Sequence, residues 1–240
     1  MTTIIQNIKN ALKSVPDQLS NASKRTLEMY GEQPISSIFI CRTPLNKTLD
    51  NVVNTISFGR WKEVKQDRGY QNMYHVSLLF TLMNNAEIIN EKNEFPEIKP
   101  LKESSSLNKQ TQYYGVGQYR QGTIKLSDFI DNTIKFMGET KFFDYKGFKN
   151  NCMVYCSDSL KANNLWTQDE ENFIMQDFEG MNNDMKKTGH GYVESVVNAV
   201  TNLGSRVGRL VGKGRMRKNK YDKIIKVVYP YFEKAKFRFL

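Results

Sequence analysis

The spacing of hydrophobic residues changes along this chain, and the changes predict a mixture of helices and strands. Within residues 1–30, Ile4, Ile8 and Leu12 recur at the interval of a helix face and predict an N-terminal helical segment. The next apolar run, Ile35–Arg42, is short, rich in β-branched residues and bounded by prolines. That combination is typical of a strand.

A β-hairpin is the clearest element that the pattern predicts. Met73–Met83 and Ala86–Phe95 have the composition of two strands, and the asparagine pair between them fits a two-residue turn. Residues 96–112, with three consecutive serines, are predicted to form a loop. Helical spacing predicts helices over Leu126–Met137, Cys152–Ala162 and Trp166–Phe178, the last with Thr167 as its N-cap. The chain is therefore expected to be α+β, with an antiparallel sheet packed on helices.

Length and composition exclude several classes of protein. The 240 residues, 39% of them hydrophobic, are enough for one domain with a real core, and they exclude a disordered chain. No apolar run is long enough for a membrane span, and the N-terminus lacks the features of a secretory signal. Three cysteines and two histidines predict neither a disulfide framework nor a structural metal site, and no phosphate-binding glycine motif indicates a cofactor.

The net charge of +10 belongs to the C-terminal end of the chain. Residues 1–203 hold 23 basic and 23 acidic residues, whereas residues 204–240 hold 12 basic residues and two acidic ones. A neutral body with a cationic tail predicts an electropositive surface for nucleic acid, an anionic membrane surface or an acidic partner such as a capsid protein. Residues 192–210 are amphipathic, which also fits a helix lying on a membrane surface.

One cysteine and one histidine are placed as a catalytic pair requires. Cys152 begins a predicted helix, after the polar pair Asn150-Asn151, and His75 lies on the first strand of the hairpin. A helix N-terminus and a neighbouring imidazole both lower the pKa of a thiol, which makes it a nucleophile. The structural alternative is a buried, inert cysteine and a histidine that serves only packing.

Several short motifs, taken in order, resemble a known family. They are the segment CRTP at Cys41–Pro44, the pair Tyr74-His75 on its strand, EKNE at Glu91–Glu94, NNC at Asn150–Cys152 and LKANNL at Leu160–Leu165. Their order resembles that of the circularly permuted papain-like fold, in which the histidine strand precedes the cysteine helix, as in lecithin:retinol acyltransferase. The chain is also similar to permuted papain-like proteins of large DNA viruses.

The resemblance divides the chain into three parts. Residues 1–30 would be an added helical segment, residues 31–182 the permuted papain-like domain, and residues 183–240 an amphipathic, basic appendage. A viral protein of this kind is expected inside the host cell, with the virion as a second location.

The residue that orients the imidazole is expected on the return strand of the hairpin. A two-residue turn would place Glu94 opposite His75, and a three-residue turn would favour Asn93 instead. Glu94 is the first candidate and Asn93 the second. Both could equally be surface residues at the end of the hairpin.

The resemblance implies thiol-based acyl transfer or hydrolysis of a peptide, isopeptide or lipid ester, through Cys152 and His75. One departure keeps an alternative open: such families often have a polar residue after the cysteine, where this chain has Met153. The alternative is an inactive structural or binding protein on the same fold, associated with a virion.

Overall fold

The computed structural model describes residues 18–45, 50–51, 53–54 and 57–190. Within these residues the chain forms seven α-helices, one short 3-10 helix and one five-stranded antiparallel sheet, which confirms the α+β class. The first 17 residues and the basic tail, including its predicted amphipathic segment, lie outside the described residues.

The chain divides into two compact units, each built from separate stretches of sequence. Of the described residues, the first unit contains 18–44, 74–145 and 150–176, and the second contains 45, 50–51, 53–54, 57–73, 146–149 and 177–190. The boundaries expected at residues 30 and 182 stay a prediction.

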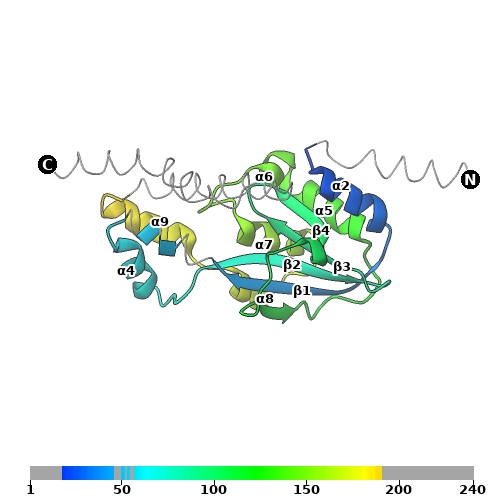
Figure 1. Cartoon of the computed structure of the whole chain (residues 1–240), viewed down its shortest axis with the longest axis horizontal. Coiled ribbons are helices and arrows are strands. Elements are labelled where there is room, and N and C mark those ends of the chain that lie inside the picture. The colour runs from blue at the N-terminus through cyan, green and yellow to red at the C-terminus, as the bar shows by residue number, and fades with distance from the viewer. Residues whose placement is uncertain (1–17, 46–49, 52, 55–56, 191–240) are drawn as a thin grey trace, which may run out of the picture. The chain divides into compact units, whose positions relative to one another are not determined.

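The sheet belongs to the first unit (Figure 1). Its strand order is β4-β3-β2-β1-β5, and every neighbouring pair is antiparallel. The strands are β1 (Ile35–Pro44), β2 (Tyr74–Leu82), β3 (Glu87–Lys92), β4 (Pro96–Pro100) and β5 (Gln112–Gly115). The strands expected from Ile35 and Met73 are thus present, whereas β4 lies where a loop was predicted.

The hairpin of β2 and β3 closes with a different turn from the one expected. Leu82 N–H donates to the carbonyl of Ala86 at 2.9 Å, so three residues, 83–85, form the turn. Asn85 takes a positive φ of 62°, the left-handed conformation that ends a three-residue hairpin loop. Ser77 therefore pairs with Glu91 and Leu78 with Asn90.

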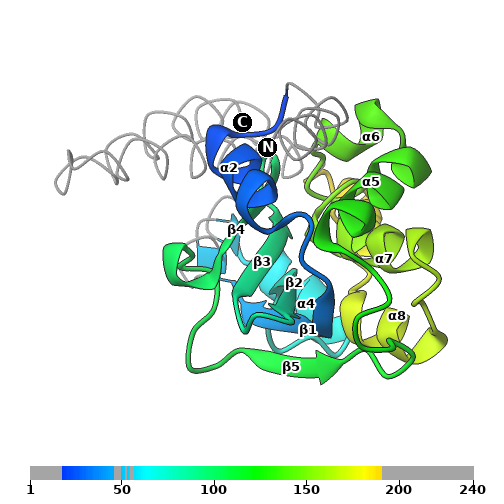
Figure 2. The same cartoon turned by 90° about the vertical axis from the view of Figure 1, so that its right-hand side faces the viewer.

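Helices cover one face of this sheet (Figure 2). Phe129 of α5 (Leu126–Met137) meets Phe80 of β2 with ring centroids 4.9 Å apart, and Tyr155 of α7 (Cys152–Ala162) donates a hydrogen bond to Asn90 of β3. The other helices of this unit are α2 (Asn21–Tyr30), α6 (Glu139–Phe143) and α8 (Gln168–Ile174), with the 3-10 helix at Leu101–Glu103. Thr167 caps α8 as predicted.

The β4 edge of the sheet is covered by α2. Ile98 N–H, which would otherwise be an unpaired donor on an edge strand, bonds to Ser23 Oγ of α2 at 3.0 Å. The two prolines that begin and end β4 are tolerated there because an edge strand needs fewer donors. Capping one edge in this way prevents another chain from pairing with it.

The second unit is helical. Helices α4 (Arg60–Asp67) and α9 (Phe178–Lys187) are joined by ion pairs from Arg68 to Asp177 and Asp184. Its core contains Val53, Trp61, Val64, Met73, Phe148, Met181 and Met185. Among the described residues, no helix of either unit is long and apolar enough to cross a membrane.

Candidate active site

Cys152 is the first residue of α7, as the sequence predicts. The side chain of Asn151 caps this helix by accepting hydrogen bonds from the N–H groups of Met153 and Val154, at 2.9 and 3.2 Å. The thiol is nearly buried, with 7% of the residue exposed. Its position at the positive end of the helix favours the thiolate form.

His75 joins this thiol to a carboxylate. Its Nε2 lies 2.8 Å from Oε2 of Glu91, and the Cys152 side chain lies close enough to the ring for each group to shift the pKa of the other. Because Nε2 is taken by the carboxylate, Nδ1 is the nitrogen left for the thiol. A thiol, an imidazole and a carboxylate in line form the arrangement of a thiol nucleophile, its base and the group that orients the base.

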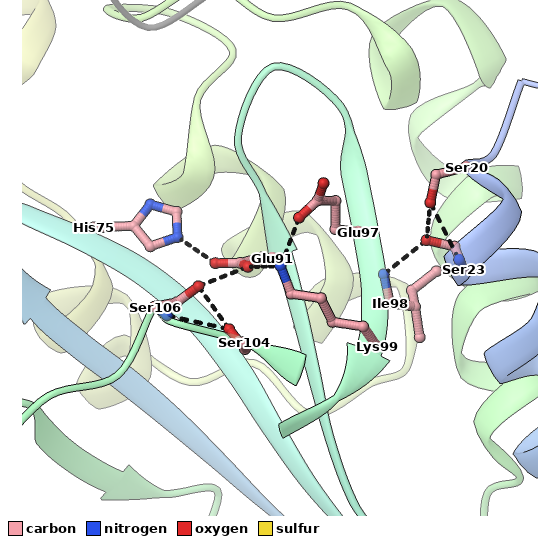
Figure 3. Close-up of polar contacts among 9 residues, drawn as sticks. All are labelled: Ser20, Ser23, His75, Glu91, Glu97, Ile98, Lys99, Ser104 and Ser106. Atoms are coloured by element: carbon pink, nitrogen blue, oxygen red, sulfur yellow. Dashed lines mark hydrogen bonds and ion pairs between the residues drawn. The ribbon is translucent and has the colours of Figure 1, made fainter. Parts of the chain in front are cut away.

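Glu91 has polar partners on both carboxylate oxygens, and its side chain has no exposed surface. Its second oxygen, Oε1, accepts a hydrogen bond from Ser106 at 2.7 Å and lies 3.0 Å from Nζ of Lys99 (Figure 3). Lys99 also pairs with Glu97 at 2.7 Å. Both carboxylate oxygens are therefore satisfied, so the charge can stay buried without a large penalty.

The electrostatics favour a thiolate–imidazolium pair. Burial alone would lower the pKa of His75, but the Cys152 thiolate and Glu91 outweigh it and raise the pKa to about 10. Burial alone would raise the pKa of Cys152, but His75 and the backbone N–H groups of Val76 and Met153 lower it below that of an ordinary thiol. In Glu91 burial is outweighed by His75 and Lys99, which lower the pKa to about 2.

The other two cysteines have the opposite electrostatics. Cys41 and Cys156 are fully buried, and burial raises the pKa of Cys41 to about 12 and that of Cys156 well above its usual value. Cys156, one turn along α7, is thus a core residue. Of the three thiols, only that of Cys152 has a lowered pKa, which favours the nucleophilic thiolate.

The carboxylate that contacts His75 is that of Glu91, where the sequence pointed to Glu94 and then Asn93. The three-residue turn moves the register, so that the position opposite His75 belongs to Asn93, but β3 ends one residue earlier, at Lys92. Glu91 points to the same face as Asn93 would and reaches His75 diagonally, which a long side chain can do. Glu94 makes no hydrogen bond to His75, and its Oε2 is buried without a partner among the described residues.

Met153, at the position where proteins of the resembled family often have a polar residue, makes a specific contact. It is buried, and its sulfur accepts a hydrogen bond from the N–H of Gln176 at 3.2 Å. The side chain of Gln176 in turn accepts from the N–H of Tyr74 at 2.9 Å. Gln176 therefore connects the neighbour of His75 with the neighbour of Cys152.

A buried lysine supports the start of the cysteine helix. Lys92 has no exposed surface, and its Nζ donates to the carbonyl of Lys141 at 2.8 Å and to Asn150 at 3.3 Å. Burial lowers its pKa to about 8. Asn150, two residues before the thiol, is fixed further by hydrogen bonds to the carbonyls of Lys141 and Asp144.

No group of three or more His, Cys, Asp or Glu side chains within the described part of the chain is arranged to hold a metal ion. Comparison of the chain with family models, with curated proteins and with solved structures finds no match. The geometry of Cys152, His75 and Glu91 is therefore the main indication of function.

Proposed function

We propose that this protein is a thiol-dependent hydrolase or acyltransferase on a permuted papain-like fold. The observation that carries the proposal is the line from Glu91 through His75 to Cys152, with the carboxylate buried and fully hydrogen-bonded. The family assignment and a viral origin rest on the resemblance of the motifs alone.

The reaction would proceed through a thioester. The Cys152 thiolate attacks the carbonyl carbon of an amide or ester, and His75 gives its proton to the departing amine or alkoxide as the bond to carbon breaks. Water or an amine then attacks the thioester while neutral His75 takes its proton, and the thiolate leaves. Backbone N–H groups at the start of α7 would stabilise the oxyanion.

An acyl donor that needs no specific recognition tests the proposal. We expect p-nitrophenyl acetate at pH 7 to acetylate Cys152 in the wild type, as located by mass spectrometry, and hydroxylamine to remove the acetyl group. Cys152→Ser is the matched control. In this variant the peptide that contains position 152 should carry no hydroxylamine-labile acetyl group. Acetylation confined to lysines, or equal on all three cysteines, would favour the inactive binding protein instead.

We also propose that residues 204–240 bind a polyanion, on the basis of their charge. Deleting them is expected to abolish retention on heparin and on anionic vesicles at about 0.1 M salt, because the rest of the chain is neutral. Loss on heparin alone would indicate nucleic acid, and loss on vesicles alone a membrane surface. Unchanged retention on both would contradict the proposal.

A further inference from the structure

Lys92 is a buried lysine that forms no ion pair with a carboxylate of the described residues. It has no exposed surface, and its Nζ donates to two neutral acceptors, the carbonyl of Lys141 at 2.8 Å and Oδ1 of Asn150 at 3.3 Å. Burying an ammonium without a carboxylate bonded to it costs free energy, and a neutral N–H group is sufficient for two such hydrogen bonds. These hydrogen bonds therefore do not explain why this position carries a charge.

The strand register places Lys92 on the face of the sheet that carries α7. Neighbouring residues of a strand point to opposite faces, and Glu91 points toward His75. Lys92 therefore points to the other face together with Asn90, whose side chain accepts a hydrogen bond from Tyr155 of α7. The ammonium lies 5.8 Å from the centroid of the Tyr155 ring. Helix α7 thus packs beside the ammonium, whereas the imidazole lies on the opposite face.

Asn150 connects the ammonium with the start of this helix. It accepts from Lys92 through Oδ1 and donates through Nδ2 to two backbone carbonyls, both at 2.8 Å. The next residue, Asn151, caps α7, and the one after it is Cys152. Burial lowers the pKa of Lys92 to about 8, and the Cys152 thiolate is one of the charges that oppose this effect. The ammonium and the thiolate are therefore close enough to interact.

Three further charged groups act on the ammonium, from α6, from the residue after it and from α7. Asp144 and Asp158 favour its protonated form, and Lys141 disfavours it. Lys141 and Asp158 are themselves paired at 2.6 Å, so together they are close to neutral. With a pKa of about 8, most of the Lys92 side chain is protonated at pH 7.

We propose that Lys92 is a positioning residue of the active site, whose buried ammonium fixes the Asn150-Asn151 pair and stabilises the Cys152 thiolate by its charge. Because it has no exposed surface, it acts through Asn150 and through its charge, and not by contact with the substrate. The inference rests on the proposed function and adds to it a source of thiol activation other than His75. The structural alternative is that Lys92 only anchors Asn150, without effect on the ionisation of the thiol.

Lys92→Met separates these possibilities, because it keeps an unbranched side chain of similar length and removes the charge. Iodoacetamide reports the thiolate, since the Cys152 sulfur forms a bond to carbon while iodide leaves. We expect the first step in the pH dependence of this reaction to move to higher pH in Lys92→Met. Below the midpoint of that step the rate should fall about threefold, because a nearby positive charge is lost.

Lys65→Met is the matched control, because it makes the same change at a buried lysine of the second unit, whose ammonium pairs with Asp50 at 2.7 Å. It should destabilise the protein and leave the first alkylation step of Cys152 unmoved. A step that moves no further in Lys92→Met than in Lys65→Met would overturn the proposal. Absence of selective alkylation of Cys152 in the wild type would instead overturn the proposed function.

A second measurement covers the case in which Lys92→Met does not fold, which alkylation of Cys41 and Cys156 would reveal. If the ammonium favours the thiolate, the thiolate favours the ammonium by the same free energy. The titration of Lys92 is therefore followed by NMR of its Cε carbon in the wild type and in Cys152→Ser. Its midpoint should lie about 0.5 pH units lower in the variant, since the thiolate is absent and His75 lies on the other face of the sheet. Equal midpoints in the two proteins would overturn the proposal.

Discussion

His75→Ala is expected to reduce the rate at which iodoacetamide alkylates Cys152 at pH 6.5 by at least tenfold. The imidazolium is the main group that lowers the pKa of this thiol, and without it burial raises the pKa. A thiol with the ordinary pKa of about 8.5 is only about 1% ionised at pH 6.5. A more basic thiolate is intrinsically more nucleophilic, but that recovers only part of the loss.

The other two cysteines serve as internal controls for this variant. Cys41 and Cys156 should stay unreactive in both the wild type and His75→Ala, because they are fully buried. If they become alkylated, the variant has lost its fold and the result says nothing about His75. A rate at Cys152 equal to that of the wild type, with the other cysteines protected, would show that His75 does not activate it.

Glu91→Gln is expected to destabilise the protein by about 3 kcal/mol and to slow alkylation of Cys152 at pH 6.5 about tenfold. The substitution removes the buried carboxylate from this network and leaves Lys99 paired with Glu97 alone and His75 with the Cys152 thiolate alone, and breaking a buried ion pair costs about 3–5 kcal/mol. It also removes the carboxylate that raises the pKa of His75, so the imidazolium stabilises the thiolate less. Urea unfolding and alkylation rates measure the two effects.

Glu94→Gln is the matched control for Glu91→Gln, because it makes the same chemical change three residues along the chain. Among the described residues Glu94 makes no hydrogen bond to His75, so the alkylation rate should change less than about twofold. A larger effect in Glu94→Gln than in Glu91→Gln would show that the hairpin register places the wrong carboxylate at the imidazole.

The pH dependence of stability tests Glu91 as well. Its pKa in the folded protein is lowered to about 2, so its contribution is present above the ordinary carboxyl pKa and is lost as the pH falls toward 2. The free energy of unfolding of the wild type should therefore fall more steeply below about pH 4.5 than that of Glu91→Gln.

The sequence predicts Cys152 and His75, which the structure brings together, but it points to Glu94 and Asn93 where the structure has Glu91 beside the imidazole. Cys152 and His75 are visible because a helix start and a strand are local features, set by Asn151 and by the apolar and aromatic composition of Tyr74–Leu82. Glu91 is not the residue directly opposite His75, and the directly opposite position depends on the length of the turn, which the asparagine pair does not fix. Ile89 and Glu91 lie two positions apart on β3 and therefore point to the same face of the sheet. This spacing is the sequence signal that indicates Glu91.

The hydrogen bond and the ion pair that hold Glu91 could not be predicted, because they depend on contacts between distant segments. Lys99 lies on β4, whose two prolines and charged residues do not have the composition of a strand, and Ser106 lies in the loop beyond it. Pairing with β3 and cover by Ser23 of α2 make β4 a strand in spite of its composition. Such tertiary contacts override local preference.

The measurement that tests the central claim most directly is the full pH dependence of Cys152 alkylation by iodoacetamide, followed by mass spectrometry in the wild type and His75→Ala. The account predicts that the wild-type rate reaches a plateau below the ordinary thiol pKa of about 8.5 and changes again near pH 10, as His75 loses its proton. In His75→Ala the rate should rise in a single step at a higher pH than the first wild-type step. Identical curves for the two proteins, or a wild-type curve centred at the ordinary thiol pKa, would contradict the thiolate–imidazolium pair and with it the proposed enzyme.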